Sequence, residues 1–244
     1  MPRVGVALLA LPSQHYLEYG SCVMRRIADQ FRGRLRIVEL NDGDAVPDKI
    51  DQALQREDPI FFFGVGHGNV NIYTVECTLP YMRVCDSRTD AMRGRVVHLN
   101  SCLTAQQLGP DLVNKGATAY YGNYEEFYLL VGEPPCSSKC MTTVFDAEYA
   151  VERSLFSGRT TGQAQQDRLR AYDDEIAYWT TGPGRNDPCA PYAVTVLTID
   201  KAIARMYGSG TARVVGYALP PLALAAAGVF ALSFGAAYLR ARRA

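Results

Sequence analysis

The chain has 244 residues, of which 48% are hydrophobic and 20% are charged, so a disordered or low-complexity protein is excluded. The 25 Lys and Arg residues balance the 25 Asp and Glu residues, and a net charge of zero gives no reason to expect a nucleic-acid partner. The seven cysteines are an odd number in a chain too long to depend on disulfides, which favours free thiols in a reducing compartment.

The first 210 residues alternate between predicted strands and helices. Apolar runs and alternating patterns that end in turn residues predict strands at 4–11, 35–40, 60–65, 95–99, 117–121 and 192–199. Apolar residues at helical spacing predict helices at 16–31, 46–56, 104–115, 142–156 and 161–178. Continuous apolar strands separated by helices are typical of a parallel sheet covered on both faces. We therefore expect an α/β domain over residues 1–210.

The end of the sequence differs sharply in composition from the rest. Residues 214–239 contain no charged side chain, and residues 240–244 include three arginines. Because about 20 apolar residues span a bilayer as a helix, we expect a C-terminal transmembrane anchor in the lipid bilayer, followed by a short basic tail. The N-terminal sequence lacks the pattern of a signal peptide, so the domain is expected on the cytoplasmic side of the membrane. A stripe of small residues would let two such helices self-associate, namely Ala227, Ala231 and Gly235.

Two predicted strands are followed by residues with catalytic chemistry. His67 follows the strand at 60–65, and Cys102 follows the strand at 95–99. If these strands are parallel neighbours, both side chains meet at the sheet edge where active sites of this fold class gather. An imidazole takes the proton of a thiol during nucleophilic attack. Gly68 has no side chain, so its N–H can approach an oxyanion closely, and a helix starting at Thr104 would lower the pKa of the Cys102 thiol.

Residues at the neighbouring strand ends are candidates for contact with a peptide substrate. Asn100 and Asn123 follow predicted strands, and Tyr124 would form one wall of a peptide groove. A carboxylate of Glu125 or Glu126 that lined this groove would favour a basic residue at P1, the substrate residue before the cleaved bond.

Other residues allow competing interpretations. A zinc site is one alternative, made by Cys77, Cys85, Cys136 and Cys140, although the first pair is spaced more widely than zinc sites require. His98 lies inside a predicted buried strand and is expected to be a hydrogen-bonded core histidine. Asp146, Glu148 and Glu152 have the spacing of an exposed helix face.

The sequence around His67 and Cys102 resembles the gingipain branch of the caspase-like cysteine peptidases, a group that also includes clostripain, legumain and separase. The resemblance rests on residues 62–68 (FFGVGHG), on residues 96–106 (VVHLNSCLTAQ) and on similar stretches up to residue 123. It implies a caspase-like three-layer sandwich that hydrolyses peptide bonds through a thioester, with no metal or organic cofactor. His67 would be the general base and acid, Cys102 the nucleophile, and the N–H groups of Gly68 and Cys102 the oxyanion donors.

Three functions are compatible with these features. The first is a membrane-anchored cysteine endopeptidase that acts on a peptide or protein substrate. The second is a catalytically silent interaction module tethered to the membrane, and the third is a thiol-dependent acyltransferase or transpeptidase. The presence of both catalytic residue types favours the endopeptidase.

Overall fold

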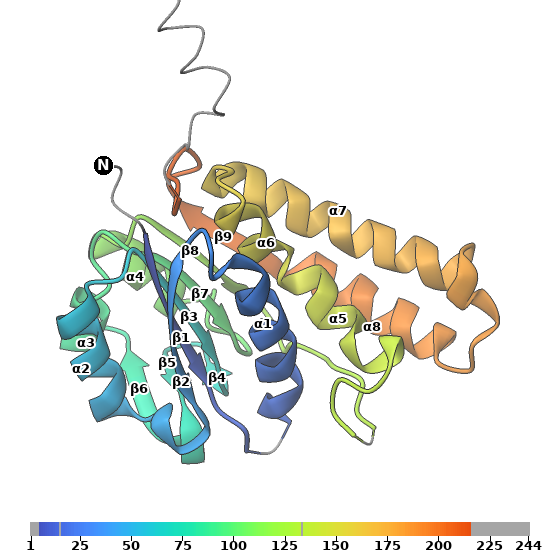
Figure 1. The fold of residues 1–244 in the computed structure, drawn as a ribbon, viewed down its shortest axis with the longest axis horizontal. Coiled ribbons are helices and arrows are strands. Elements are labelled where there is room, and N and C mark those ends of the chain that lie inside the picture. The colour runs from blue at the N-terminus through green and yellow to red at the C-terminus, as the bar shows by residue number, and fades with distance from the viewer. Residues whose placement is uncertain (1–4, 15, 133, 216–244) are drawn as a thin grey trace, which may run out of the picture. The chain divides into compact units, whose positions relative to one another are not determined.

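A computed structural model describes residues 5–14, 16–132 and 134–215, which belong to one α/β unit (Figure 1). The strands of its central sheet are β1 (Val6–Leu11), β2 (Arg36–Asn41), β3 (Phe61–Val65), β7 (Val96–Asn100), β8 (Ala119–Asn123) and β9 (Ala204–Gly208). Their spatial order is β2-β1-β3-β7-β8-β9. The first five strands are parallel, and β9 is antiparallel to β8. The expected mostly parallel sheet is therefore confirmed.

Helices cover both faces of the sheet because successive strand residues point to opposite faces. Phe61 and Phe63 of β3 enter one hydrophobic core, whereas Phe62 enters the other. The helices that pack into the first core are α1 (Leu17–Phe31), α5 (Lys139–Glu148) and α6 (Ala150–Phe156). Those that pack into the second core are α2 (Pro47–Glu57) and α4 (Leu108–Asn114). The fold is thus three-layered, with the sheet between two layers of helices (Figure 1).

The remaining elements lie outside this arrangement or extend it. A second, antiparallel sheet consists of β4 (Gly68–Asn69), β5 (Ile72–Thr74) and β6 (Pro80–Arg83). The other helices are α3 (Ser87–Asp90), α7 (Thr161–Thr180) and α8 (Ala190–Ile203), with short 3-10 helices η1 (Asp42–Asp44), η2 (Glu76–Thr78) and η3 (Pro183–Asn186). Thr160 caps α7 by accepting the Gln163 N–H, and the Gln163 side chain accepts the Thr160 N–H in return.

The strand predicted at 192–199 is wrong, because this segment lies within helix α8. Its Val and Thr residues favour a strand locally. However, Ala193, Leu197 and Asp200 are buried at helical spacing, and α8 packs against α5 and α7. Burial of this face therefore outweighs the local preference, and the strand of this region, β9, begins only at Ala204.

Two further helix predictions differ from the structure in their bounds. The helix predicted at 104–115 begins at Leu108, so the residues that follow Cys102 form turns instead. The helix predicted at 142–156 is divided into α5 and α6 at Tyr149, whose N–H bonds to the Phe145 carbonyl.

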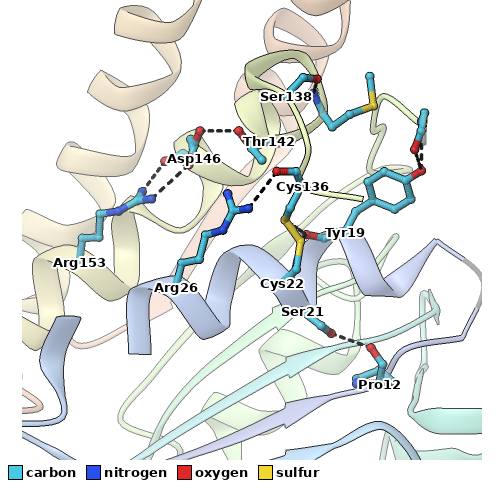
Figure 2. The surroundings of a disulfide bond; sticks show 12 residues. Pro12, Tyr19, Ser21, Cys22, Arg26, Cys136, Ser138, Thr142, Asp146 and Arg153 are labelled. Atoms are coloured by element: carbon cyan, nitrogen blue, oxygen red, sulfur yellow. Dashed lines mark hydrogen bonds and ion pairs between the residues drawn. A yellow bond between two sulfur atoms is a disulfide. The ribbon is translucent and has the colours of Figure 1, made fainter. Parts of the chain in front are cut away.

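Four of the seven cysteines form disulfides, which contradicts the expectation of free thiols. Cys22 of α1 is bonded to Cys136, and Cys140 of α5 is bonded to Cys189, which precedes α8. Figure 2 shows the first bridge, beside which the Arg26 guanidinium donates to the Cys136 carbonyl oxygen at 2.9 Å. Disulfides are typical of oxidising compartments. The paired cysteines are separated by 114 and 49 residues in the sequence, so no short sequence motif predicts the two bonds.

The zinc alternative is wrong for the same reason. Cys136 and Cys140, two of its four proposed ligands, belong to separate disulfides, which leaves Cys77 and Cys85 as exposed thiols. Among the described residues, no group of His, Cys, Asp and Glu side chains is arranged to hold a metal ion.

The predicted anchor at 214–239 lies outside the described residues from position 216 onward, together with Ala227, Ala231, Gly235 and the tail at 240–244. Its first residue, Val214, is buried in the core of the α/β unit. Within the part of the chain that the structure describes, no helix is both long enough and apolar enough to cross a membrane.

Candidate active site

The structure places the strands that lead to His67 and Cys102 side by side. β3 and β7 are hydrogen-bonded parallel neighbours, with Val65 opposite Asn100. His67 follows Val65 by two residues, and Cys102 follows Asn100 by two residues, so the two leave the same sheet edge at equivalent positions. His67 is exposed and Cys102 is half-buried. A thiol and an imidazole are thus delivered to one accessible edge by adjacent strands.

The loop that carries His67 is held firmly on both sides. The His67 carbonyl oxygen accepts hydrogen bonds from the N–H (2.9 Å) and the hydroxyl (3.2 Å) of Thr74 in β5. The Gly66 N–H donates to the Asn100 carbonyl oxygen at 3.2 Å. Gly68 lies against the Cys102 carbonyl oxygen so closely that an added Cβ would overlap it. The histidine loop therefore contacts the cysteine turn, and only glycine fits at position 68.

The turn that carries Cys102, residues 101–107, is shaped by backbone contacts to the end of β8. Leu103 adopts a left-handed conformation (φ 62°), which is uncommon for a residue with a side chain. Its N–H donates to the Glu125 carbonyl oxygen at 3.0 Å, and the Ala105 N–H donates to the Asn123 carbonyl oxygen at 3.1 Å. Because α4 starts only at Leu108, the expected helix N-terminus beside the thiol is absent, and this part of the prediction is wrong.

The environment of the Cys102 sulfur favours the protonated thiol. Burial raises the pKa of Cys102, and the carboxylates of Glu126 and Asp200 raise it further, whereas the Phe127 N–H, which donates to Sγ at 3.4 Å, lowers it. The net pKa lies above the ordinary value of a cysteine. A nucleophilic Cys102 therefore needs a neighbouring base that removes its proton during attack.

The two asparagines predicted to contact substrate are buried instead. Asn100 is 4% exposed and Asn123 is 0% exposed. The Asn100 Oδ1 atom accepts a hydrogen bond from the Tyr149 hydroxyl, and the Asn123 Oδ1 atom accepts one from the Arg168 guanidinium, both at 3.0 Å. In this conformation these side chains fix the ends of β7 and β8 and are not accessible to a ligand.

The other predicted substrate contacts are accessible. Tyr124 and Glu125 are exposed directly after β8, and their carbonyl oxygens accept hydrogen bonds from the Gln106 side chain (2.8 Å) and the Leu103 N–H (3.0 Å). Glu126 is exposed as well, and it is the carboxylate of this loop that acts on the Cys102 thiol. Glu126, and not Glu125, is therefore the exposed carboxylate of this loop that raises the pKa of Cys102.

Behind the cysteine turn lies a cluster of charged side chains, His98, Glu148, Glu152 and Arg168, which are all fully buried. His98 Nδ1 lies 2.6 Å from Glu152, and His98 Nε2 lies 3.2 Å from Glu148. Arg168 binds both carboxylate oxygens of Glu148, one of them at 2.9 Å. The prediction of a hydrogen-bonded core histidine is confirmed, whereas that of an exposed helix face at Glu148 and Glu152 is wrong.

This ion cluster is charge-balanced. Burial would lower the pKa of His98, but Glu152 and Glu148 raise it above its usual value. Burial would likewise raise the pKa of Glu148, but Arg168 and His98 hold it at about 2. The basic side chains of His98 and Arg168 thus contact the acidic side chains of Glu148 and Glu152, and such pairing is the condition under which buried ionisable groups are tolerated.

Sequence reasoning missed the buried carboxyl group of Asp200 in α8, which lies near the candidate nucleophile. Asp200 is 0% exposed, and burial raises its pKa to about 8. The only signal in the sequence is that Asp200 directly follows residues 189–199, a segment without charged side chains. Because the Val and Thr residues of that segment favour a strand, the position of Asp200 relative to Cys102 is not predictable from the sequence.

Comparison with known proteins supports the fold. No family model and no curated protein sequence matches this chain. The chain is similar to gingipain R (RgpB), described as an Arg-specific cysteine proteinase, with a TM-score of 0.52 and 12% identity, covering 86% of this chain and 47% of that one. It is also similar to the complex of the pro- and mature domains of RgpB from Porphyromonas gingivalis, with a TM-score of 0.53 and 8% identity, covering 86% of this chain and 49% of that one. The chain therefore spans about half the length of these proteins, and it has the fold of a gingipain-type, caspase-like domain.

Proposed function

We propose that this protein is a cysteine endopeptidase in which Cys102 is the nucleophile and His67 is the general base. The observation that carries the proposal is the register of β3 and β7, which brings both residues to equivalent positions at one sheet edge. The half-buried thiol with its raised pKa adds the chemical need for a base at that place.

The proposed reaction proceeds in two steps. His67 removes the Cys102 proton while the sulfur attacks the carbonyl carbon of the substrate, and the N–H groups of Gly68 and Cys102 donate to the resulting oxyanion. His67 then gives the proton to the leaving amine, and the C–N bond breaks to leave a thioester. Water then attacks the thioester carbon while His67 takes its proton; the C–S bond breaks, and His67 gives that proton to the departing sulfur, which leaves the carboxylic acid and the free Cys102 thiol. His67 takes up one proton and gives it away again in each step, so it ends each step uncharged. The proposed reaction uses no cofactor.

We also propose that the uncharged stretch ending at residue 239 anchors the protein in a membrane. Because Val214 is buried in the core of the α/β unit, the proposed span lies within residues 216–239, which are uncharged and numerous enough to cross a bilayer. The disulfides Cys22–Cys136 and Cys140–Cys189 favour an oxidising compartment for the α/β unit. This replaces the cytoplasmic side that the sequence alone suggested.

The acidic groups around the thiol suggest a basic P1 residue. Glu126 and Asp200 are the two acidic residues whose carboxyl groups act on Cys102, and Glu126 is the exposed one. Gingipain R, the similar structure, is described as Arg-specific. A substrate with arginine or lysine at P1 would bring its cation next to the Glu126 carboxylate.

Replacing Glu126 with glutamine is expected to lower kcat/KM for peptides with arginine at P1 by roughly tenfold, because one charge-assisted contact is lost. Peptides with a neutral P1 residue should be affected much less. Glu125→Gln is the matched control, since Glu125 is a neighbouring exposed carboxylate that is not among the charges acting on Cys102. Equal losses for both P1 types, or for both variants, would contradict the assignment of Glu126.

The proposal is tested by offering the full chain a peptide library that varies the residue at P1 and by reading the products with mass spectrometry. Cleavage is expected to stop after treatment with iodoacetamide. Peptide mapping should then find the carbamidomethyl group on Cys102, with Cys77 and Cys85 as the reference free thiols. Absence of cleavage under all conditions, or inhibition without modification of Cys102, would overturn the proposal.

A further inference from the structure

The carboxyl group of Asp200 and the sulfur of Cys102 are contacted by consecutive amides of one segment, residues 124–132. The Phe127 N–H donates to Cys102 Sγ at 3.4 Å, and the Tyr128 N–H donates to Asp200 Oδ1 at 3.0 Å. Asp200 is fully buried in α8, and its second oxygen, Oδ2, has no hydrogen-bond partner among the described residues. One backbone unit therefore connects a buried carboxyl group to the thiol.

The 124–132 segment depends on such contacts for its position, because it forms neither helix nor strand. Side chains fix it at intervals. Gln106 donates to the Tyr124 carbonyl oxygen at 2.8 Å, and Tyr19 exchanges hydrogen bonds with the backbone of Gly132. Between Tyr124 and Gly132, Asp200 contacts the Tyr128 N–H, which directly follows the Phe127 N–H that donates to Cys102. Loss of that contact would leave the Phe127 N–H free to turn away from the sulfur.

The charged and titratable groups around Asp200 come from several elements. Burial raises its pKa to about 8 and Glu148 of α5 raises it too, whereas the Tyr128 N–H and Arg168 of α7 lower it. Tyr172 of α7 is the further titratable group on which Asp200 acts. On the side of the thiol, Glu126 is the second carboxylate that acts on Cys102. At neutral pH the carboxyl group is therefore mostly protonated, and its negative charge appears only as the pH rises through about 8.

We infer that Asp200 is a positioning residue for the candidate nucleophile. Its carboxyl group fixes the Tyr128 amide and so holds the Phe127 N–H against Cys102 Sγ, where this donor stabilises the thiolate. The relevance for catalysis rests on the proposed function. The effect of this amide on the thiol is measured through the reactivity of Cys102, which does not require peptide cleavage.

The first test compares two variants of the full chain that differ in one amide. Tyr128→Pro removes the N–H that Asp200 accepts, whereas Tyr128→Ala removes the same exposed ring and keeps the N–H. The rate of carbamidomethylation of Cys102 by iodoacetamide is followed from pH 6 to 10 by peptide mapping, with the exposed Cys77 and Cys85 as internal references. Tyr128→Pro is expected to react about threefold more slowly than Tyr128→Ala at pH 7.5, which corresponds to half a pKa unit.

The second test changes the acceptor. Asp200→Asn keeps an oxygen for the Tyr128 N–H, and Asp200→Ala removes it. Asp200→Ala should therefore react about threefold more slowly than Asp200→Asn at pH values well below the thiol pKa, and the two rates should converge as the pH rises above it. Above pH 8, Asp200→Asn should also react faster than the unmodified chain, because the charge that opposes thiolate formation is gone. Asp173→Asn is the control, since it removes an exposed carboxylate that pairs with Lys201 on the surface.

Equal rates within both pairs would overturn the inference, because the carboxyl group would then act through its charge or through stability alone. If Asp200→Ala does not fold, as judged by circular dichroism, the Tyr128 pair decides the question. The outcomes separate this inference from the proposed function. Different rates within the pairs, without any peptide cleavage, would contradict the endopeptidase proposal and support the positioning role of Asp200. Peptide cleavage with equal rates within the pairs would support the endopeptidase and contradict the positioning role.

Discussion

Replacing Cys102 with alanine is expected to reduce peptide cleavage by at least roughly a thousandfold, because no thioester can form without the sulfur. His67→Ala should reduce kcat by roughly a hundred- to ten-thousandfold, since the thiol, whose pKa is raised by burial and by Glu126 and Asp200, then keeps its proton. The two residues act in the same step, so the double variant should be no slower than Cys102→Ala. Initial rates of cleavage of a peptide found in the library screen measure all three.

The controls for this prediction are already present in the chain. Cys85→Ala removes a different free thiol, which is exposed, and it should leave cleavage unchanged because Cys85 contacts Asp111 of α4 through its N–H and is not part of the proposed dyad. All variants should show the same thermal unfolding midpoint, since Cys102 and His67 are not core residues. Residual cleavage above a tenth of the original rate in Cys102→Ala would rule out Cys102 as the nucleophile. Additive losses in the double variant would mean that Cys102 and His67 do not act in the same step.

Much of the fold follows from local patterns in the sequence. The strands β1, β3 and β7 are mostly apolar runs, and such strands predict a parallel sheet, whereas their order in the sheet comes from the structure. The candidate site is predictable on the condition that β3 and β7 are neighbours, because the residues that follow two such strands meet at one sheet edge. Helix α8 was not predicted, because its Val and Thr residues favour a strand. Its packing against α5 and α7 stabilises the helix instead.

The contacts between distant residues were not predictable in the same way. Cys22 and Cys136 are 114 residues apart, and pairing among seven cysteines cannot be deduced from their spacing. Glu148 and Glu152 follow the spacing of a helix face, but the sequence does not say whether that face meets water or His98. The sequence does contain one signal for these contacts, namely His98 inside an apolar strand. A buried imidazole requires hydrogen-bonding partners, and acidic side chains of another element can provide them.

These buried partners connect the core to the candidate site. Arg168 of α7 contacts Glu148 of α5, the Asn123 side chain at the end of β8 and the Arg205 carbonyl oxygen of β9. The backbone of Asn123 in turn holds the cysteine turn through the Ala105 N–H. The ion cluster therefore fixes the strand ends from which the loops of the site depart, and its integrity should govern both stability and site geometry.

Arg168→Met is expected to lower the free energy of unfolding by roughly 3–5 kcal/mol at pH 7, because it leaves the Glu148 carboxylate buried without its main cation. Methionine keeps most of the side-chain volume, so the loss reports the charge and the hydrogen bonds rather than a cavity. Urea unfolding followed by circular dichroism measures it, with midpoints compared at equal slope. Arg170→Met on the same helix is the matched control. The Arg170 side chain is 67% exposed, and its guanidinium pairs with Asp167 at 3.4 Å, a surface contact worth less than about 1 kcal/mol.

The loss in Arg168→Met should shrink as the pH falls from 7 to 4. Arg168 and His98 hold the pKa of Glu148 at about 2, which is below its ordinary value, so in the unmodified chain this group contributes stability at pH values above about 4.5 and loses it as the pH falls through about 2. Without Arg168 the pKa of Glu148 rises, and the variant takes up a proton at a higher pH, which discharges the buried carboxylate. A loss that is independent of pH, or one that equals the loss in Arg170→Met, would mean that the cation of Arg168 does not balance the cluster.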